Sequence, residues 1–160
     1  MKKVLPHVGQ RRLLKLAEFL RELSPKRFNF GRWVGSDWGG AQDLSCGTTA
    51  CAVGWMPAIP FFRRVGVYFT KGEFGEAVVS LKKKGMSGRH VKVSFDSIDT
   101  AVQVFGLSVD QAEALFTHNA NLYSKSGSAK LLSGLGSNAS AARVAWQIEK
   151  FVDHWKAGKL

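Results

Sequence analysis

The chain has 160 residues, of which 45% are hydrophobic, and it carries a formal net charge of +11. This apolar content excludes an intrinsically disordered chain, and the length predicts a single domain over residues 1–160. No stretch approaches the roughly 20 consecutive apolar residues of a membrane-spanning helix, so we expect no contact with a membrane.

Positive charge is concentrated in particular segments of the sequence. Residues 1–33 contain nine Lys/Arg and two acids, and residues 61–92 contain eight Lys/Arg and two acids. Residues 93–123 contain four acids and neither Lys nor Arg. Segregation of this kind favours contact with a polyanion such as nucleic acid or a nucleoprotein. The alternative is a solvated surface whose charge only keeps the protein soluble.

The N-terminal region predicts an amphipathic helix over residues 10–23, ended by Ser24-Pro25. Arg11 and Arg12 interrupt the apolar run that a secretory signal would need, so we expect a cytoplasmic protein. Trp33 and Trp38 follow in a Gly-rich loop. They are expected to pin that loop to the core, or alternatively to form a platform for a base or a peptide. The helix is expected to bury six residues: Leu13, Leu14, Leu16, Ala17, Leu20 and Leu23.

Small and apolar residues in segment 45–56 predict a short buried helix that begins near Ser45 and is closed by Gly54 and Pro57. Residues 65–95 then change to β-branched and aromatic residues that partly alternate and are separated by glycines. This pattern predicts an antiparallel meander of two or three strands. The connection 82–90 would form its basic, exposed tip, and a partly helical segment 74–84 is the alternative.

Two helices separated by Gly106 are predicted over 97–117, and Ser108 with Gln111 matches a capping box for the second. Asp110 and Glu113 on that second helix argue against a DNA-recognition helix, so we interpret the pair as core scaffold. The second helix is expected to bury Val109, Ala112, Leu115 and Phe116.

After a Ser/Gly-rich loop over about 124–137, Asn138 or Ser140 starts a last amphipathic helix. Its expected apolar residues are Ala142, Val144, Ala145, Ile148, Phe151, Val152 and Trp155. The predicted fold class is α+β: mostly helical, with a small antiparallel β meander around residues 65–95.

One pattern resembles a group of small bacterial and phage proteins of uncharacterised activity. Residues 23–30 and Trp33 are followed by Cys46-Gly-Thr-x-x-Cys-x-x-Gly-Trp55, and residues 104–116 resemble their second half. Many members have His in place of Trp55. The resemblance implies a phage or mobile element as the source, but it carries over no catalytic residue and no cofactor.

The two cysteines permit three interpretations. Cys46 and Cys51 are five residues apart, which places them about 140° apart on a helix and poorly for one zinc ion. Cys46 near a helix N-terminus would have a lowered thiol pKa and could act as a nucleophile, with His90 or His118 as the base. The commoner outcome is a pair of packed thiols. We therefore expect no metal and no catalytic site.

The basic hairpin is the strongest candidate for a binding site, because clustered lysines neutralise phosphates without reading bases. Its predicted residues are Lys82, Lys83, Lys84, Arg89 and Lys92, with Arg63 and Arg64 added to the same face. A solvated turn is the alternative. A second, weaker cluster comprises Lys2, Lys3, Arg11, Arg12 and Lys15.

Together these features predict a non-enzymatic basic binding protein of phage or mobile-element type, with nucleic acid or a nucleoprotein as its partner and no cofactor. The first alternative is a phage-type inhibitor or adaptor that binds a host defence protein. The second is a Cys46-dependent enzyme. The sequence leaves the oligomeric state and the choice between DNA, RNA and protein open.

Overall fold

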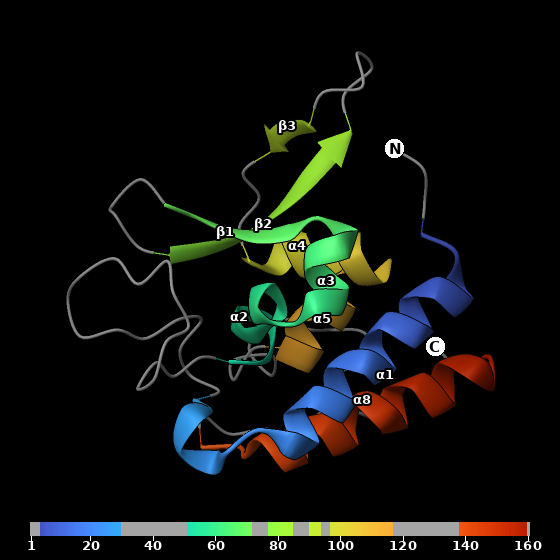
Figure 1. Ribbon diagram of the computed structural model, residues 1–160. Coiled ribbons are helices and arrows are strands. Elements are labelled where there is room, and N and C mark those ends of the chain that lie inside the picture. Colours follow the sequence, from blue (N-terminus) through green and yellow to red (C-terminus); the bar gives the residue numbers. More distant parts are fainter. Residues whose placement is uncertain are drawn as a thin grey trace.

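The computed structural model describes residues 4–29, 51–71, 77–84, 90–93, 97–116 and 138–159 (Figure 1). The described parts are mostly helical and include one three-stranded antiparallel sheet, which confirms the predicted α+β class. Helices α1 and α8 lie side by side at one end, the sheet lies at the other end, and the shorter helices fill the space between (Figure 1).

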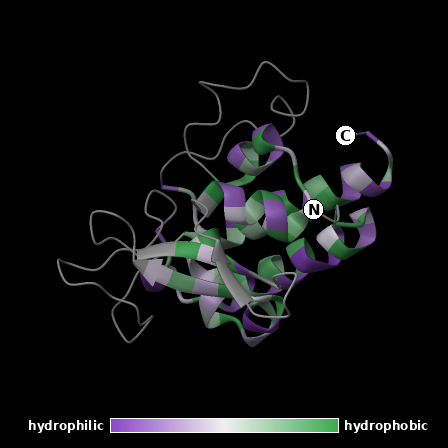
Figure 2. Cartoon of the chain, turned by 90° about the horizontal axis from the view of Figure 1, so that it is seen from above, coloured by the Kyte–Doolittle hydropathy of each residue, from purple (hydrophilic) through white to green (hydrophobic). Residues whose placement is uncertain are grey.

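The helices bear hydrophobic residues toward their neighbours and hydrophilic ones on the opposite side (Figure 2). The described α-helices are α1 (Pro6–Glu22), α2 (Ala52–Trp55), α3 (Pro60–Val65), α4 (Ser97–Phe105), α5 (Val109–Phe116) and α8 (Ala141–Lys156). Two 3-10 turns, η1 (Pro25–Arg27) and η2 (Met56–Ala58), adjoin α1 and α2.

Helix α1 begins four residues before the predicted start, because Pro6 occupies its first turn, where the fixed φ of proline suits a helix. It ends at Glu22, in agreement with the predicted stop. Its core face is confirmed for Leu13, Leu16, Ala17 and Leu20, and Leu23 packs against the core. The prediction for Leu14 was wrong: the side chain is 36% exposed, because it lies at the edge of the buried stripe.

Helix α2 begins at Ala52, with Cys51 at its N-cap, and ends at Trp55. The helix ends one residue after Gly54 and two residues before Pro57, close to the predicted stop. Gly54 lies inside it and is buried, and Pro57 belongs to the turn η2. The predicted start near Ser45 lies outside the described residues.

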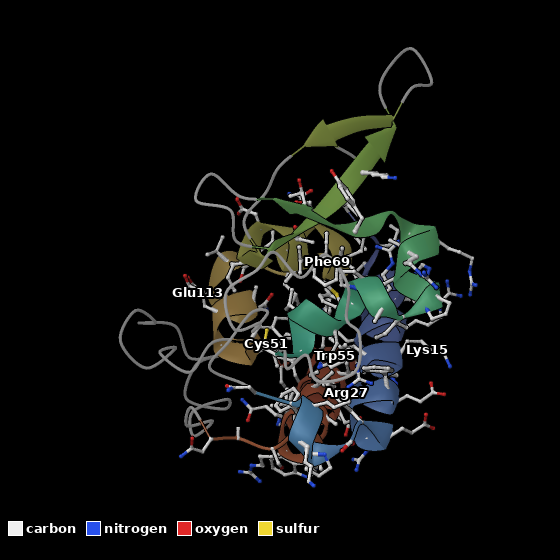
Figure 3. The ribbon with its side chains drawn as sticks, turned by 60° about the vertical axis from the view of Figure 1, so that its left-hand side comes forward. Lys15, Arg27, Cys51, Trp55, Phe69 and Glu113 are labelled. Carbon is white, nitrogen blue, oxygen red and sulfur yellow. The ribbon has the colours of Figure 1, made fainter. Side chains whose placement is uncertain are left out.

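Trp55 is the main anchor of this region (Figure 3). It is 2% exposed, and its Nε1 donates a hydrogen bond of 3.2 Å to the backbone oxygen of Arg27. The Arg27 guanidinium lies 4.6 Å from the centroid of the indole, and the centroid of the Phe19 ring lies 5.8 Å from it. Trp55 therefore fastens the turn after α1 to the core.

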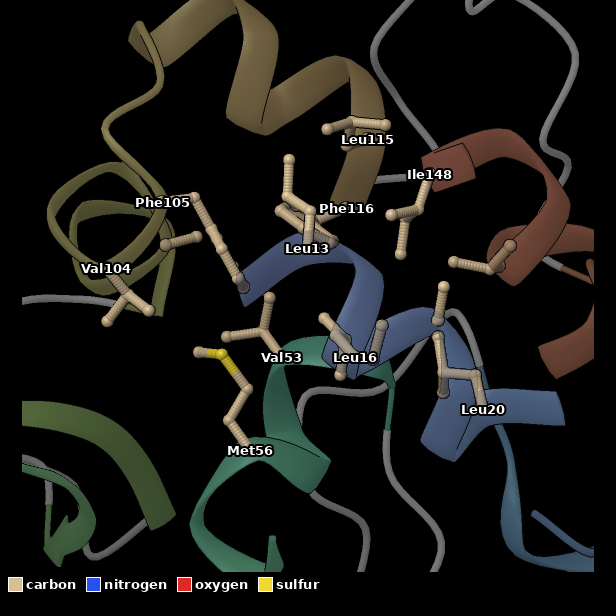
Figure 4. Close-up of a cluster of buried hydrophobic side chains, with 14 of the residues drawn as sticks. Leu13, Leu16, Leu20, Val53, Met56, Val104, Phe105, Leu115, Phe116 and Ile148 are labelled. Carbon is tan, nitrogen blue, oxygen red and sulfur yellow. The ribbon is translucent and has the colours of Figure 1, made fainter. Parts of the chain in front are cut away.

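Aromatic rings join the middle helices to one another. The Phe62 and Phe105 rings meet edge to face with centroids 5.9 Å apart, and Phe105 stacks on Phe116 at 5.6 Å. Leu13 and Ile148 bring α1 and α8 into the same buried cluster (Figure 4). Helices far apart in the sequence thus share one hydrophobic core.

The helix pair α4–α5 follows the predicted pattern. Gly106 separates the helices with φ of 70°. Ser108 and Gln111 form the predicted capping box, since each side chain accepts the other's backbone N–H at 3.2 Å and 2.9 Å. The prediction that Val109 is buried was wrong: this first-turn residue is 48% exposed. Ala112, Leu115 and Phe116 are buried as predicted.

Helix α8 starts after Ser140, whose hydroxyl accepts the Arg143 N–H at 3.2 Å, one of the two predicted starts. Its buried stripe agrees with the prediction at Val144, Ala145, Ile148, Phe151 and Val152. It differs at the ends and in the middle, because Ala142 is exposed while Ala141 and Gln147 are buried, and Trp155 is only partly buried. Helix α8 runs antiparallel to α1. Arg21 pairs with Glu149 near one end of this helix pair, and Gly9 lies beside Trp155 near the other.

The predicted meander is confirmed as strands β1 (Val67–Lys71), β2 (Ala77–Lys84) and β3 (His90–Val93) in the order β1-β2-β3. The helical alternative was wrong for residues 77–84. Val67 and Val79 are buried, and the Thr100 hydroxyl of α4 donates to the Val79 carbonyl at 2.9 Å. This bond holds β2 against the helical body.

Candidate functional site

Strand β2 extends beyond its first partner. It pairs with β1 over residues 77–81 and with β3 over residues 81–84. Past Leu81, therefore, β2 and β3 form a two-stranded ribbon, which rises from the helical body at the top of Figure 1. We call residues 82–84 and 90–92 the cationic ribbon.

The ribbon has an unusual composition. Of its six residues, four are lysines, one is His90 and one is Val91, and none is acidic. Lys82 is the direct register partner of Lys92, and Lys84 is that of His90. Directly opposed like charges destabilise a strand pair. The placement of these lysines therefore opposes the stability of the ribbon, so their presence requires another explanation.

The prediction that Lys82, Lys83 and Lys84 lie in a connecting tip was wrong, because all three belong to β2. Backbone pairing with β3 overrides the poor strand propensity of lysine. Strand geometry also divides the cluster, since successive residues alternate between the two faces. Positions 82, 84 and 92 belong to one face and position 83 to the other. Arg89 lies outside the described residues.

Lys82 is exposed, and its Nζ lies 5.2 Å from the centroid of the Tyr68 ring. Tyr68 was not among the predicted site residues. It occupies the same sheet face, because its register partner is Ser80, two residues before Lys82. Burial raises the pKa of Tyr68, so the phenol stays neutral beneath the ammonium. Lys82 makes no ion pair with any residue that the structure describes.

Arg63 and Arg64 lie exposed in the last turn of α3, next to the base of the ribbon. Gly66 caps this helix with φ of 103°, and its carbonyl accepts the Lys82 N–H at 2.9 Å. A Cβ at Gly66 would lie 3.1 Å from the Lys82 carbonyl oxygen. The two arginines also complement the negative C-terminal end of the helix dipole, which is a structural reason for their position.

The second predicted cluster, on α1, is partly used within the fold. Arg12 donates to the Val104 carbonyl at 2.5 Å, and burial lowers its pKa. Lys15 pairs with Glu18 at 2.5 Å. Arg11 is exposed, while Lys2 and Lys3 lie outside the described residues. This surface therefore has fewer free cations than its sequence suggests.

Cys51 is buried, as the interpretation of a packed thiol predicts. Burial raises its pKa to about 11, which keeps the thiol protonated and unreactive at neutral pH. Within the described ranges, no group of three His, Cys, Asp or Glu residues could hold a metal ion. Cys46 and His118 lie outside those ranges, so the nucleophile hypothesis stays a prediction.

No protein-family model, curated protein or solved structure matches this chain. The resemblance to small phage proteins accordingly stays a prediction. Among the described helices, none is both long enough and apolar enough to cross a membrane.

Proposed function

We propose that this chain is a non-enzymatic, cytoplasmic binding protein of phage or mobile-element type, and that its cationic ribbon engages the phosphate backbone of nucleic acid. The observation that carries the proposal is the opposition of Lys82 and Lys92 in a ribbon without acidic residues. Phosphates placed between or beside such lysines replace repulsion with attraction.

The surroundings of the ribbon support the same partner. Arg63 and Arg64 extend the positive surface toward α3, and Lys82 is exposed without an ion pair among the described residues. Lysine on a strand contributes a point charge and no fixed fork of donors. The site therefore suits recognition of phosphate charge, with little discrimination between base sequences.

The test is the salt dependence of binding to a short fluorescent DNA duplex, measured by anisotropy. The ribbon variant combines Lys82→Gln, Lys83→Gln, Lys84→Gln and Lys92→Gln. Removal of each lysine–phosphate interaction should reduce the slope of log affinity against log salt by about 0.9, or up to about 3.6 for all four. Folding should be almost unchanged, since glutamine keeps most of the aliphatic stem of lysine and removes only its charge.

The matched control removes four positive charges from other surfaces. It combines Arg11→Gln, Lys26→Gln, Lys150→Gln and Lys156→Gln, all at exposed positions of α1, η1 and α8. We expect the control to keep most of the wild-type slope. Equal reductions of the slope in the two variants would contradict a site at the ribbon and indicate diffuse electrostatics.

Failure of the wild-type protein to bind DNA or RNA even at low salt would overturn the proposal. An acidic surface on a host protein would then become the expected partner, as in the inhibitor alternative.

A further inference from the structure

The geometry of the cationic ribbon points to one class of nucleic acid. We infer that the ribbon enters the major groove of B-form duplex DNA and places one of its faces toward each phosphate-lined wall. This inference rests on the proposed function and specifies the substrate of the same site.

The dimensions of the ribbon fit that groove. Neighbouring strands lie about 4.8 Å apart, so the backbone of the two-stranded ribbon is narrower than that groove. The major groove is about 12 Å wide and about 8.5 Å deep, and it admits a two-stranded ribbon, whereas the minor groove is only about 6 Å wide. The paired part of β2 and β3 also projects away from the described helices (Figure 1).

The distribution of lysines between the two faces carries the inference furthest. Positions 82, 84 and 92 share one face, and position 83 lies on the opposite face with its register partner Val91. A ribbon that lies flat on a nucleic acid needs cations on one face. A ribbon between two phosphate-lined walls needs them on both, and the cationic ribbon has lysine positions on both.

The ribbon suits single strands and RNA duplexes less well than duplex DNA. Proteins that bind single strands stack bases on exposed aromatic rings, and the six residues of the ribbon include no Phe, Tyr or Trp. Among the described residues, Trp146 of α8 is the aromatic residue that is exposed. Helix α8 lies at the opposite end of the molecule from the ribbon (Figure 1). The major groove of A-form RNA is too narrow and deep for such a ribbon.

The experiment compares four probes of one base sequence at about 0.1 M salt. They are plain duplex DNA, the same duplex with glucosylated 5-hydroxymethylcytosine, the plain duplex saturated with netropsin, and the RNA duplex. The neutral glucose fills the major groove and leaves the phosphates intact, whereas netropsin fills the minor groove. We expect glucosylation and the RNA duplex each to weaken binding by at least about eightfold, which corresponds to one lysine–phosphate interaction at this salt. Netropsin should leave the affinity almost unchanged.

Single substitutions test the two faces separately. Lys83→Gln and Lys84→Gln remove one charge from opposite faces, and each should weaken binding to plain duplex by about eightfold. Lys156→Gln on α8 removes one charge elsewhere and should have little effect.

Equal affinity for the plain and glucosylated duplexes, or no effect of Lys83→Gln, would overturn groove entry. Both outcomes would leave phosphate binding itself intact. The absence of binding to all four probes would instead contradict the proposed function.

Discussion

The helical body and the cationic ribbon differ in whether their charged side chains have compensating partners. In the body, Arg21 of α1 forms two hydrogen bonds with Glu149 of α8, at 2.8 and 2.5 Å. Arg12 is satisfied by a backbone carbonyl of α4. In the ribbon, Lys82 is opposed by another lysine. The charges of the body are thus compensated within the fold, whereas the like-charge pair of the ribbon is not compensated by its register partner.

The two regions also differ in what holds them together. The body is fastened by buried rings and by close contact between α1, α4 and α8. The ribbon consists of two strands with lysine positions on both faces, so neither face has the apolar composition that packs onto a core. Isolated two-stranded ribbons are only marginally stable in water. Substitutions should therefore affect stability in the body and affinity in the ribbon.

The largest effect on stability is expected from Gly9→Ala in α1. An added Cβ would overlap the Phe105 carbonyl oxygen and lie 3.2 Å from Cη2 of Trp155, so α1 must move away from α4 or α8. We expect a decrease of about 3 kcal/mol in the free energy of unfolding, measured by urea titration. Ala157→Gly, at the exposed C-cap of α8, serves as the control. An unchanged midpoint for Gly9→Ala would show that this three-helix contact is not rigid.

An intermediate effect on stability is expected from ionisation of the buried Cys51 thiol. Its pKa is raised to about 11 by burial, whereas an unfolded thiol ionises near about 8.5. The stabilising contribution of the protonated thiol is therefore fully present below about pH 8.5 and is lost as the pH rises toward 11. Wild-type stability should fall more steeply over that range than the stability of Cys51→Ala. Parallel pH profiles for the two proteins would contradict a buried, neutral thiol.

The prediction that both cysteine thiols are packed can be tested by an independent measurement. Cys51→Ser should lower the melting temperature more than it alters binding, because the substitution replaces a buried apolar thiol with a hydroxyl that must be desolvated. The same is expected of Cys46→Ser if both thiols are packed. Loss of function in Cys46→Ser with an unchanged melting temperature would support the enzyme alternative.

The smallest effect on stability is expected for Lys92→Gln, and this substitution should raise the free energy of unfolding rather than lower it. Removing one member of the opposed pair relieves repulsion, so stability should rise by a few tenths of a kcal/mol at low salt. Affinity for DNA should fall in the same variant. Lys82→Gln should be stabilised less, because it also removes the cation–π interaction with Tyr68. A destabilised Lys92→Gln would show that this residue supports the fold.

Local signals in the sequence predicted much of the fold. Gly106, the capping box of Ser108 and Gln111, and the cap at Ser140 act through hydrogen bonds or backbone angles within a few residues. The incorrect predictions concern residues whose burial depends on contacts with distant parts of the chain. Periodicity placed Leu14 and Val109 in the core, but which edge of a helix faces solvent depends on its neighbours.

The candidate site was predicted as a cluster but not as a geometry. Sequence proximity identified Lys82, Lys83 and Lys84, and the later strand supplied Lys92. Their division between two faces follows from pairing with β3, which depends on the register of a partner strand. Tyr68 was missed for the same reason. Its alternation with Val67 and Phe69 was a usable signal, because it places Tyr68 on the face opposite the core.

Leu81 lies at the junction between the three-stranded part of the sheet and the cationic ribbon. In the described pairing, it is the β2 residue with partners on both sides, Val67 on β1 and Val93 on β3. Separation of β3 from β2 can therefore proceed as far as Leu81 without breaking the pairs between β1 and β2. Local fluctuations of this kind require far less free energy than global unfolding. If the proposed partner requires a different ribbon twist, the change can be confined to the few residues beyond Leu81 while the core stays folded.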